Sequence, residues 1–348
     1  MTLDWFAIVS GFSAGLALFL YGMTVMGDTL AEVAGERMQR VLARFTSNRF
    51  AGIGTGTIAC AVLDSSSATA IITIALVNAG ILTSVAALGV VMGANIGTTL
   101  SSVIIASGLI KYSGFILLSG LTLRVFGRSV IQQRYGTVIL GLGLILYGLF
   151  TIEHAAEPLQ AFPPIEAWLA QMNNPFLGVL AGAVVTAIIQ SSSATVGIVI
   201  VLAGQGMLTP AAGVAIMLGA EIGTCANVLV ASIGRSRAAV RVGLFQLLFN
   251  VTVVALFVWL VGPLTMFSAW TVGVDSHTAS KSLIAAAHVI FNVISVLLFL
   301  PFVPATARLL TWLVPDQTDP AHQEKADDPG TESFHDVGID KPVLARSY

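Results

Sequence analysis

The stretch Asp64-Ser65-Ser66-Ser67-Ala68-Thr69 interrupts an apolar segment and returns 126 positions later as Gln190-Ser191-Ser192-Ser193-Ala194-Thr195, inside another apolar segment. The same gapless shift holds around both clusters, where about 20 of the 51 positions from Arg49 to Thr99 are identical to their counterparts. A register shared over this length indicates an internal duplication. The chain therefore divides into a first unit, residues 1–126, and a second unit, residues 127–262.

The composition places this duplication in a membrane. Hydrophobic residues make up 56% of the chain, charged residues 10%, and the mean hydropathy is +0.89. So few charges cannot cover a water-exposed surface, and several apolar runs are long enough to cross a bilayer. The first run, from Trp5 to Met26, is longer than the apolar core of a signal peptide. We expect an all-α, multi-pass integral protein of the plasma (inner) membrane that contacts lipid and binds no nucleic acid.

Two further segments follow the duplicated units. Residues 263–315 contain another apolar run, which predicts one extra C-terminal transmembrane helix. Residues 316–348 are polar and carry eight acids, so we predict a disordered acidic tail. The acids are Asp316, Asp319, Glu324, Asp327, Asp328, Glu332, Asp336 and Asp340.

Charge predicts opposite orientations for the two units. The predicted loop from Gly27 to Arg49 carries four arginines, whereas its counterpart from Glu153 to Pro175 carries neither Lys nor Arg. The arginines are Arg37, Arg40, Arg44 and Arg49. Because cytoplasmic loops are enriched in positive charge, the first loop is predicted inside and the second outside. This inverted topology requires an odd number of crossings in each unit.

Each unit has an odd number of membrane crossings only if its serine segment is a re-entrant hairpin, which returns to the side from which it enters. The apolar arms before the serines, Ala51–Leu63 and Phe176–Ile189, are each roughly 20 Å long as helices, too short to cross the membrane. Hairpins at about residues 50–79 and about 176–205 leave three crossings per unit, in the first unit near 5–26, 83–108 and 112–126. The hairpins would enter from opposite faces, and their tips would meet near the midplane, enclosed by protein or a watery cavity.

Three consecutive serines at a helix break are suited to binding an anion. The hydroxyls can cap the second arm, whose free backbone N–H groups carry partial positive charge. Two such helix ends facing each other would form a site for an oxyanion. The alternative is that the serines only provide small residues for helix packing.

A second duplicated motif has a different character. Gly93-Ala94-Asn95-Ile96-Gly97-Thr98-Thr99 is mirrored by Gly219-Ala220-Glu221-Ile222-Gly223-Thr224-Cys225. Glycines on both sides of a polar residue predict local unwinding, and the exposed carbonyl and side-chain oxygens would suit Na⁺. Close helix packing through small residues is the alternative.

Together with His288-Val289-Ile290-Phe291-Asn292, these paired motifs resemble the type II sodium-dependent phosphate cotransporters over residues 10–305. The resemblance implies Na⁺-coupled symport of inorganic phosphate by alternating access, in a bacterial type of member without a cytoplasmic regulatory domain. It implies no cofactor beyond Na⁺ as coupling ion, and leaves a homodimer open. The implied phosphate-binding residues are Ser65, Ser66, Ser67, Gln190, Ser191, Ser192 and Ser193. The residues expected to bind Na⁺ are Asp64, Thr69, Asn95, Thr98, Thr195, Glu221 and Thr224, with His288, Asn292 and Asn250 as a second layer.

Two carboxylates depart from the family pattern, which has Gln at position 64 and Asn at position 221. An unpaired charge at this depth costs at least about 2.5–3.5 kcal/mol, and neither hairpin arm contains a Lys or Arg to balance it. Asp64 and Glu221 would therefore bind a cation, carry a proton, or indicate an oxyanion other than phosphate. A passive anion channel or a sensor also stays open. The sequence does not indicate an enzyme, because a single serine nucleophile does not explain two serine clusters.

Overall fold

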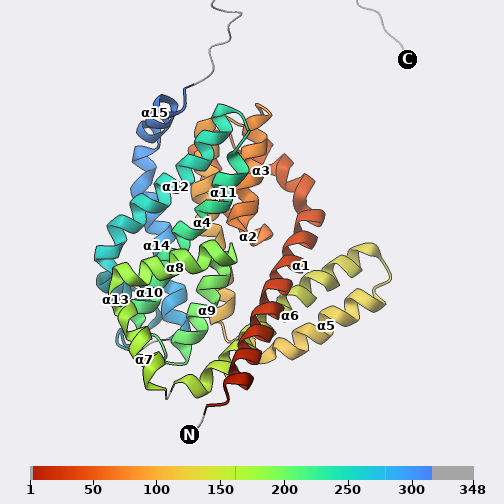
Figure 1. Ribbon diagram of the computed structural model, residues 1–348. Coiled ribbons are helices and arrows are strands. Elements are labelled where there is room, and N and C mark those ends of the chain that lie inside the picture. The colour runs from red at the N-terminus through yellow and green to blue at the C-terminus, as the bar shows by residue number, and fades with distance from the viewer. Residues whose placement is uncertain (1–2, 161, 279, 316–348) are drawn as a thin grey trace, which may run out of the picture.

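The computed structural model describes residues 3–160, 162–278 and 280–315, and every regular element in these ranges is a helix (Figure 1). The predicted tail, residues 316–348, lies outside the described residues. In chain order the α-helices are α1 (Trp5–Phe45), α2 (Arg49–Leu63), α3 (Ser66–Asn78), α4 (Ser84–Ala106), α5 (Ser113–Phe126), α6 (Val130–Ala156), α7 (Pro163–Ala170), α8 (Pro175–Ile189), α9 (Ser192–Gly204), α10 (Pro210–Gly223), α11 (Cys225–Ser232), α12 (Arg237–Phe257), α13 (Val261–Val272), α14 (Lys281–Phe299) and α15 (Val303–Leu313).

Seven stretches of the described chain are long and apolar enough to cross a membrane. They are Trp5–Ala34, Ser84–Ala106, Leu109–Phe126, Val130–Leu159, Pro210–Ser232, Arg237–Val272 and Lys281–Leu313. Three fall in the first unit, three begin in the second, and one follows. This confirms an all-α, multi-pass membrane protein, and the number agrees with three crossings per unit plus one. The opposite orientation of the units stays a prediction.

Two predicted boundaries need correction. The stretch from Gly27 was predicted as a loop, but α1 continues through it to Phe45. These residues are mostly good helix formers, and Met38 and Leu42, one turn apart, are buried against the protein. The extra C-terminal helix is also shorter than residues 263–315, because the first ten of these residues belong to the sixth apolar stretch and a helix begins again only at Lys281.

The two serine segments fold as pairs of short helices. In the first unit α2 and α3 have 15 and 13 residues, and in the second α8 and α9 have the same lengths. None of these helices reaches the roughly 20 residues needed to cross a bilayer. α8 also meets the preceding segment, Pro163–Asn173, at a bend of 106°. These short pairs lie where the re-entrant hairpins are predicted, and their position relative to a membrane stays a prediction.

The duplicated glycine motif packs helices together and does not unwind the first copy. α4 is a continuous helix through Gly93–Thr99, and only the second copy is interrupted, at Thr224 between α10 and α11. A Cβ on Gly93 would lie 2.1 Å from the Ile53 carbonyl oxygen of α2, and one on Gly219 would lie 2.0 Å from the Val179 oxygen of α8. The prediction of local unwinding is therefore wrong for the first unit. In each unit the first arm of the hairpin packs on a longer helix, which we call its scaffold helix: α2 packs on α4, and α8 packs on α10. Glycine is required because the backbones of the arm and the scaffold helix lie so close that a side chain would overlap.

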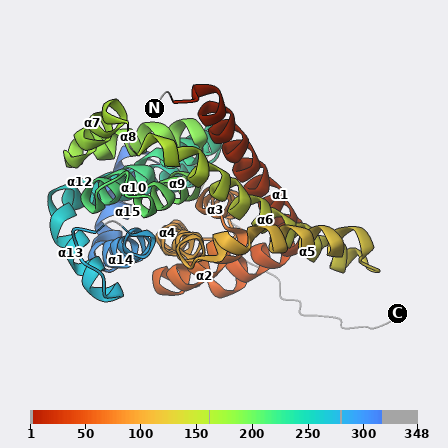
Figure 2. The same cartoon turned by 90° about the horizontal axis from the view of Figure 1, so that it is seen from below.

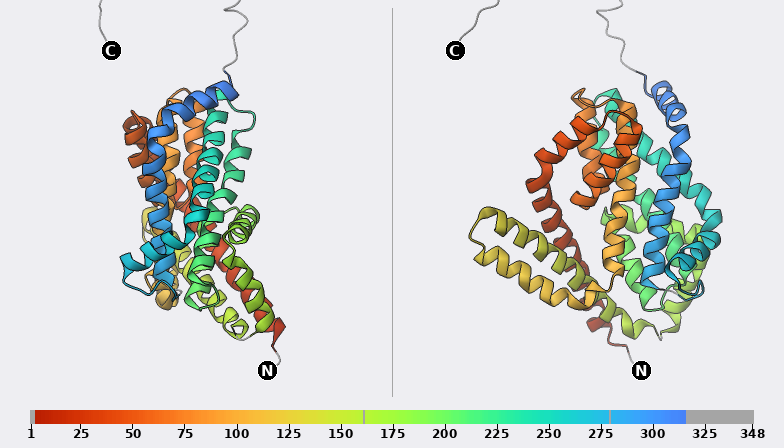
Figure 3. Two further views of the ribbon diagram at one scale, coloured as in Figure 1. Left: turned by 90° about the vertical axis from the view of Figure 1, so that its left-hand side faces the viewer. Right: turned by 180° about the vertical axis from the view of Figure 1, so that it is seen from behind.

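The remaining helices surround the two hairpins. α1 packs along α6, its counterpart in the second unit, and α6 also packs on α5. Figures 1 and 3 show the α5–α6 pair projecting to one side of the molecule. Figure 2 shows α4, α10, α12 and α14 grouped on the other side of α1. α4 and α10, which support the two hairpins, both contact α12 and α14, so this four-helix group joins the units.

Candidate functional site

Each hairpin turns at one residue in the left-handed backbone conformation. These residues are Asp64, with φ of 51°, and Gln190, with φ of 63°, and they occupy equivalent positions in the two units. They are the non-glycine residues of the described chain with positive φ. This conformation costs an L-residue about 1–2 kcal/mol, although Asp tolerates it better than most. The surrounding fold therefore holds both tips in a strained turn that separates the two arms.

The first serine of each cluster caps the second arm. Ser65 Oγ accepts a hydrogen bond from the Ala68 backbone N–H at 3.1 Å, and Ser191 Oγ accepts one from Ala194 at 3.2 Å. This confirms the predicted capping of α3 and α9. The N–H groups at the start of a helix have no acceptor within the helix, so Ser66 and Ser192 each present an N–H group and a hydroxyl at an electropositive helix end.

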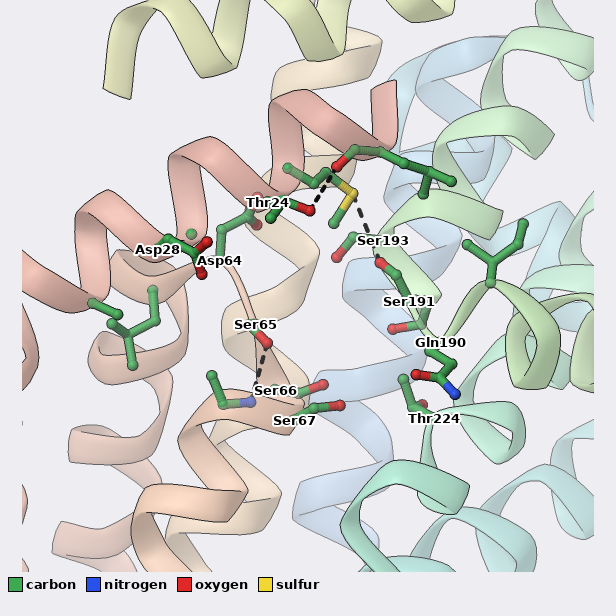
Figure 4. Close-up of a pocket in the computed structure, with 18 of the residues that line it drawn as sticks. Thr24, Asp28, Asp64, Ser65, Ser66, Ser67, Gln190, Ser191, Ser193 and Thr224 are labelled. Carbon is green, nitrogen blue, oxygen red and sulfur yellow. Dashed lines mark hydrogen bonds between the residues drawn. The ribbon is translucent and has the colours of Figure 1, made fainter. Parts of the chain in front are cut away.

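The two tips face one pocket of about 530 Å³ (Figure 4). It is lined by Leu20, Met23, Thr24, Gly27, Asp28, Ala31, Leu63, Asp64, Ser65, Ser66, Ser67, Ala68, Ile72, Ile189, Gln190, Ser191, Ser192, Ser193 and Thr224. All seven residues expected to bind phosphate are in this set. The structure therefore brings together two clusters that lie 126 positions apart in the sequence, and no Lys, Arg or His lines the pocket.

The pocket also contains two carboxylates. Asp64 is half-buried at the tip of the first hairpin, where it accepts a hydrogen bond from Ser101 Oγ of α4. Asp28 on α1 is exposed, and Thr24 lies one turn before it. Sequence reasoning missed Asp28 because the apolar run was ended at Met26, and it did not consider Thr24, which lies within that run. The signal was present, since two polar residues four apart in a helix share a face. Two ionised carboxylates would repel a bound anion, so this pair needs either a cation or a proton beside the anion site.

Behind the pocket, Glu221 lies in a buried polar network. Its Oε1 atom is 2.9 Å from His288 Nε2 and accepts a hydrogen bond from Asn292 Nδ2 at 3.2 Å. Asn250 Nδ2 donates to the Glu221 backbone oxygen at 2.8 Å, and Asn95 Nδ2 donates to Asn250 Oδ1 at 2.7 Å. The three residues predicted as a second layer thus do surround an expected ion-binding residue.

The sequence argument looked only for Lys or Arg within the hairpin arms, and the structure places the His288 imidazole against Glu221 instead. The imidazole comes from α14, and its Nδ1 atom lies 2.7 Å from Ser102 Oγ of α4. Glu221 and His288 are almost inaccessible to solvent, at 2% and 0% exposure. Ser102 was not predicted, although it lies seven residues after Asn95, two turns along the same face of α4. A buried acid with a hydrogen-bonded imidazole is far less costly than an isolated charge.

The four threonines expected to bind Na⁺ support the backbone in this structure. Thr69 and Thr195 donate to the carbonyls of Ser65 and Ser191, and Thr98 and Thr224 donate to those of Asn95 and Glu221. Among these threonines only Thr224 lines the pocket. A direct role of the other three in ion binding stays a prediction.

Comparisons with known proteins agree with this geometry. The family model described as Na⁺/Pi-cotransporter matches residues 18–154 and 160–296, which together make up most of the chain. The chain belongs to this family. The resemblance inferred from the paired serine and glycine motifs is thereby confirmed.

Individual relatives match the chain over different lengths, and two of the three described here have names that refer to phosphate. The chain is 30% identical to "Uncharacterized protein YqeW" of Bacillus subtilis (strain 168) over 309 residues, 88% of this chain and 99% of that protein. It is 26% identical to "Putative inorganic phosphate export protein YjbB" of Escherichia coli (strain K12) over 307 residues, 88% of this chain but only 56% of that protein. A segment of 61 residues, 17% of this chain, is 43% identical to 9% of the human "Sodium-dependent phosphate transport protein 2B". No solved structure matches the chain.

Proposed function

We propose that this protein transports inorganic phosphate across the membrane, with Na⁺ as the coupling ion. The observation that carries the proposal is the pair of capped helix ends facing one pocket. Both ends present free backbone N–H groups and serine hydroxyls, which together suit an oxyanion. Membership of the Na⁺/Pi-cotransporter family supports phosphate as that oxyanion.

The two pocket carboxylates support cation coupling. Asp28 and Asp64 would repel phosphate, and no basic side chain lines the pocket to offset them. A Na⁺ ion beside these acids would neutralise the local field and supply the positive charge that the anion needs. Thr24 and Thr224 can add hydroxyl oxygens to such a site. Binding of either ion would then raise the affinity for the other, which is the thermodynamic basis of symport.

The duplicated architecture supports alternating access as the transport mechanism. The two tips line the same pocket but belong to different units, and each packs on its own scaffold helix. Rocking one hairpin and its scaffold against the other would open the pocket first to one side and then to the other. The name of the Escherichia coli relative specifies phosphate export, so export is a second candidate direction of net transport for this protein. The Na⁺ and phosphate gradients across the membrane decide between import and export.

Uptake of radiolabelled phosphate into liposomes containing the purified protein tests this function. An inward Na⁺ gradient should drive accumulation, and the same gradient of K⁺ should not. Equal uptake with K⁺ would reject Na⁺ coupling. If labelled sulfate accumulated and labelled phosphate did not, the substrate would be a different oxyanion.

A further inference from the structure

The two hairpin tips differ in the residue that precedes each serine cluster. Asp64 holds this position in the first tip and Gln190 in the second, and both residues line the pocket. Figure 4 shows the first tip, with Asp64, on one side of the pocket and the second tip, with Gln190, across from it. An ionised carboxylate can only accept hydrogen bonds, whereas an amide both donates and accepts them. The first tip therefore offers a bound anion an acceptor that the second tip does not repeat.

The other polar groups of the two tips can donate to an anion. Each second arm begins with free backbone N–H groups and serine hydroxyls, and the Gln190 amide adds further N–H groups. The unprotonated oxygens of a tetrahedral oxyanion accept such hydrogen bonds. An unprotonated oxygen beside Asp64 would instead face the lone pairs and the negative charge of the carboxylate. The oxygen of the anion that lies beside Asp64 is accommodated without repulsion when it carries a proton.

Asp64 is held in place with part of its carboxylate free. The hydroxyl of Ser101 on α4 donates a hydrogen bond to Asp64 Oδ1, and the left-handed turn fixes the backbone of the same residue. No hydrogen bond from the described residues reaches the second oxygen, Oδ2. A carboxylate has about four lone-pair sites, so the bond from Ser101 leaves most of them available to a ligand in the pocket.

We propose that Asp64 selects the substrate by accepting a hydrogen bond from a P–OH group, so that the pocket binds protonated phosphate and excludes oxyanions without a hydroxyl group. Both forms of phosphate that are common near neutral pH carry a P–OH group, whereas sulfate carries no proton. The substrate itself thus supplies the proton that a carboxylate needs beside an anion, and Asp28 on α1 is left to the cation. This role of Asp64 rests on the proposed transport of phosphate.

Charge repulsion alone does not make this distinction. Hydrogen phosphate and sulfate are both tetrahedral dianions, so the negative charge of Asp64 acts on both alike, and they differ by the proton of the P–OH group. Sulfate at this position loses one charge-assisted hydrogen bond and places lone pairs against lone pairs. The wild-type protein should therefore prefer phosphate to sulfate by roughly a hundredfold or more.

Anions matched in shape and charge test the hydroxyl group directly. Uptake of labelled phosphate into liposomes is measured under an inward Na⁺ gradient, at mildly alkaline pH, with arsenate, monofluorophosphate or sulfate as the competitor. Arsenate carries a hydroxyl group as phosphate does, and monofluorophosphate has the shape of phosphate with fluorine in place of the hydroxyl group. Arsenate should compete about as well as unlabelled phosphate. Monofluorophosphate and sulfate should each require roughly hundredfold higher concentrations.

Asp64→Asn should narrow this difference by roughly ten- to a hundredfold. Asparagine tolerates the left-handed conformation, its Oδ1 can still accept the hydrogen bond from Ser101, and its Nδ2 can donate to an unprotonated anion oxygen. Asp28→Asn is the matched control, because it removes the other carboxylate of the pocket. This control should shift the affinities for all four anions together and leave their ratios unchanged.

Equal competition by arsenate, monofluorophosphate and sulfate in the wild-type protein would overturn the proposal, as would an unchanged ranking in Asp64→Asn. If Asp64→Asn does not fold, the wild-type ranking and the ratios in Asp28→Asn decide. Thermal unfolding in detergent gives the same ranking without transport, because an anion that binds only the folded state stabilises it. Stabilisation by phosphate and arsenate alone, in a protein without Na⁺-driven uptake, would support the role of Asp64 while rejecting the proposed function. Na⁺-driven phosphate uptake that sulfate inhibits as well as arsenate does would reject the role of Asp64 and keep that function.

Discussion

The hairpins of the two units have the same helix lengths and the same left-handed turn, but the units place their carboxylates at different points. In the first unit the acid is at the hairpin tip, Asp64, and the scaffold helix carries the amide Asn95; in the second the amide Gln190 is at the tip and the acid Glu221 is on the scaffold helix. The tip acid lines the phosphate pocket, whereas the scaffold acid is buried against His288. The two units therefore share the geometry of the hairpin tips but differ in where the acid lies, at the tip in the first unit and on the scaffold helix in the second.

The largest expected difference between the units is in stability. Glu221→Ala should lower the free energy of unfolding by about 3–5 kcal/mol, because it leaves His288 buried without its carboxylate. Asn95→Ala, at the equivalent position, should cost only about 1–3 kcal/mol, the value for a buried neutral partner. Thermal unfolding in detergent measures both.

Glu166→Ala on α7 is the control for removing an acid, because that side chain is exposed. Equal losses in Glu221→Ala and Asn95→Ala would show that the charge at Glu221 contributes nothing beyond its hydrogen bonds.

The phosphate-binding tips should instead behave alike. Ser66→Ala and Ser192→Ala each remove a hydroxyl from an equivalent helix end in the pocket, so each should weaken phosphate binding by about 1.5–3 kcal/mol, or roughly ten- to a hundredfold. Half-saturating phosphate concentrations for uptake measure the effect.

Ser119→Ala on α5 should have no such effect, since that serine is exposed and its hydroxyl donates to the Ile116 carbonyl of its own helix. A loss confined to one of the two tips would mean that the anion binds a single hairpin.

The close contact of each hairpin with its scaffold gives a further symmetric prediction. Gly93→Ala and Gly219→Ala should each destabilise the protein by about 1–3 kcal/mol, because the new methyl group would overlap the backbone of α2 or α8. Unfolding temperatures measure the change. Gly54→Ala on α2 has open space around it and should be neutral or stabilising. Tolerance at Gly93 but not at Gly219 would show that the first hairpin can move away from α4.

The smallest expected effect distinguishes the two tips. Gln190→Gly should stabilise the protein by less than about 1 kcal/mol, because glycine adopts the left-handed conformation without strain. Asp64→Gly gains the same relief but loses the hydrogen bond from Ser101, so it should be neutral or destabilising. The comparison requires unfolding measurements on both variants under one condition. Stabilisation of the same size at both positions would indicate that the bond between Ser101 and Asp64 contributes little.

Much of the site could be predicted because its residues are local to a duplicated motif. The serines, the helix break and the caps depend on neighbours within four positions, and the repeat identifies each partner cluster. Asp28 was missed because hydropathy alone ended α1 about 19 residues too early, at Met26. In the first unit the glycines were misread as sites of unwinding, because a sequence shows where a Cβ is absent but not which backbone lies opposite.

By itself the sequence determined the membrane class and the helix breaks at the two serine clusters, and it predicted the two units and the anion-binding role of the tips, since each depends on local composition and spacing. Only the tertiary structure decided that Glu221 meets His288 and that α1 supplies Asp28 to the pocket. These contacts join residues tens to hundreds of positions apart. Their physical origin is the packing of whole helices, and no single segment encodes that packing.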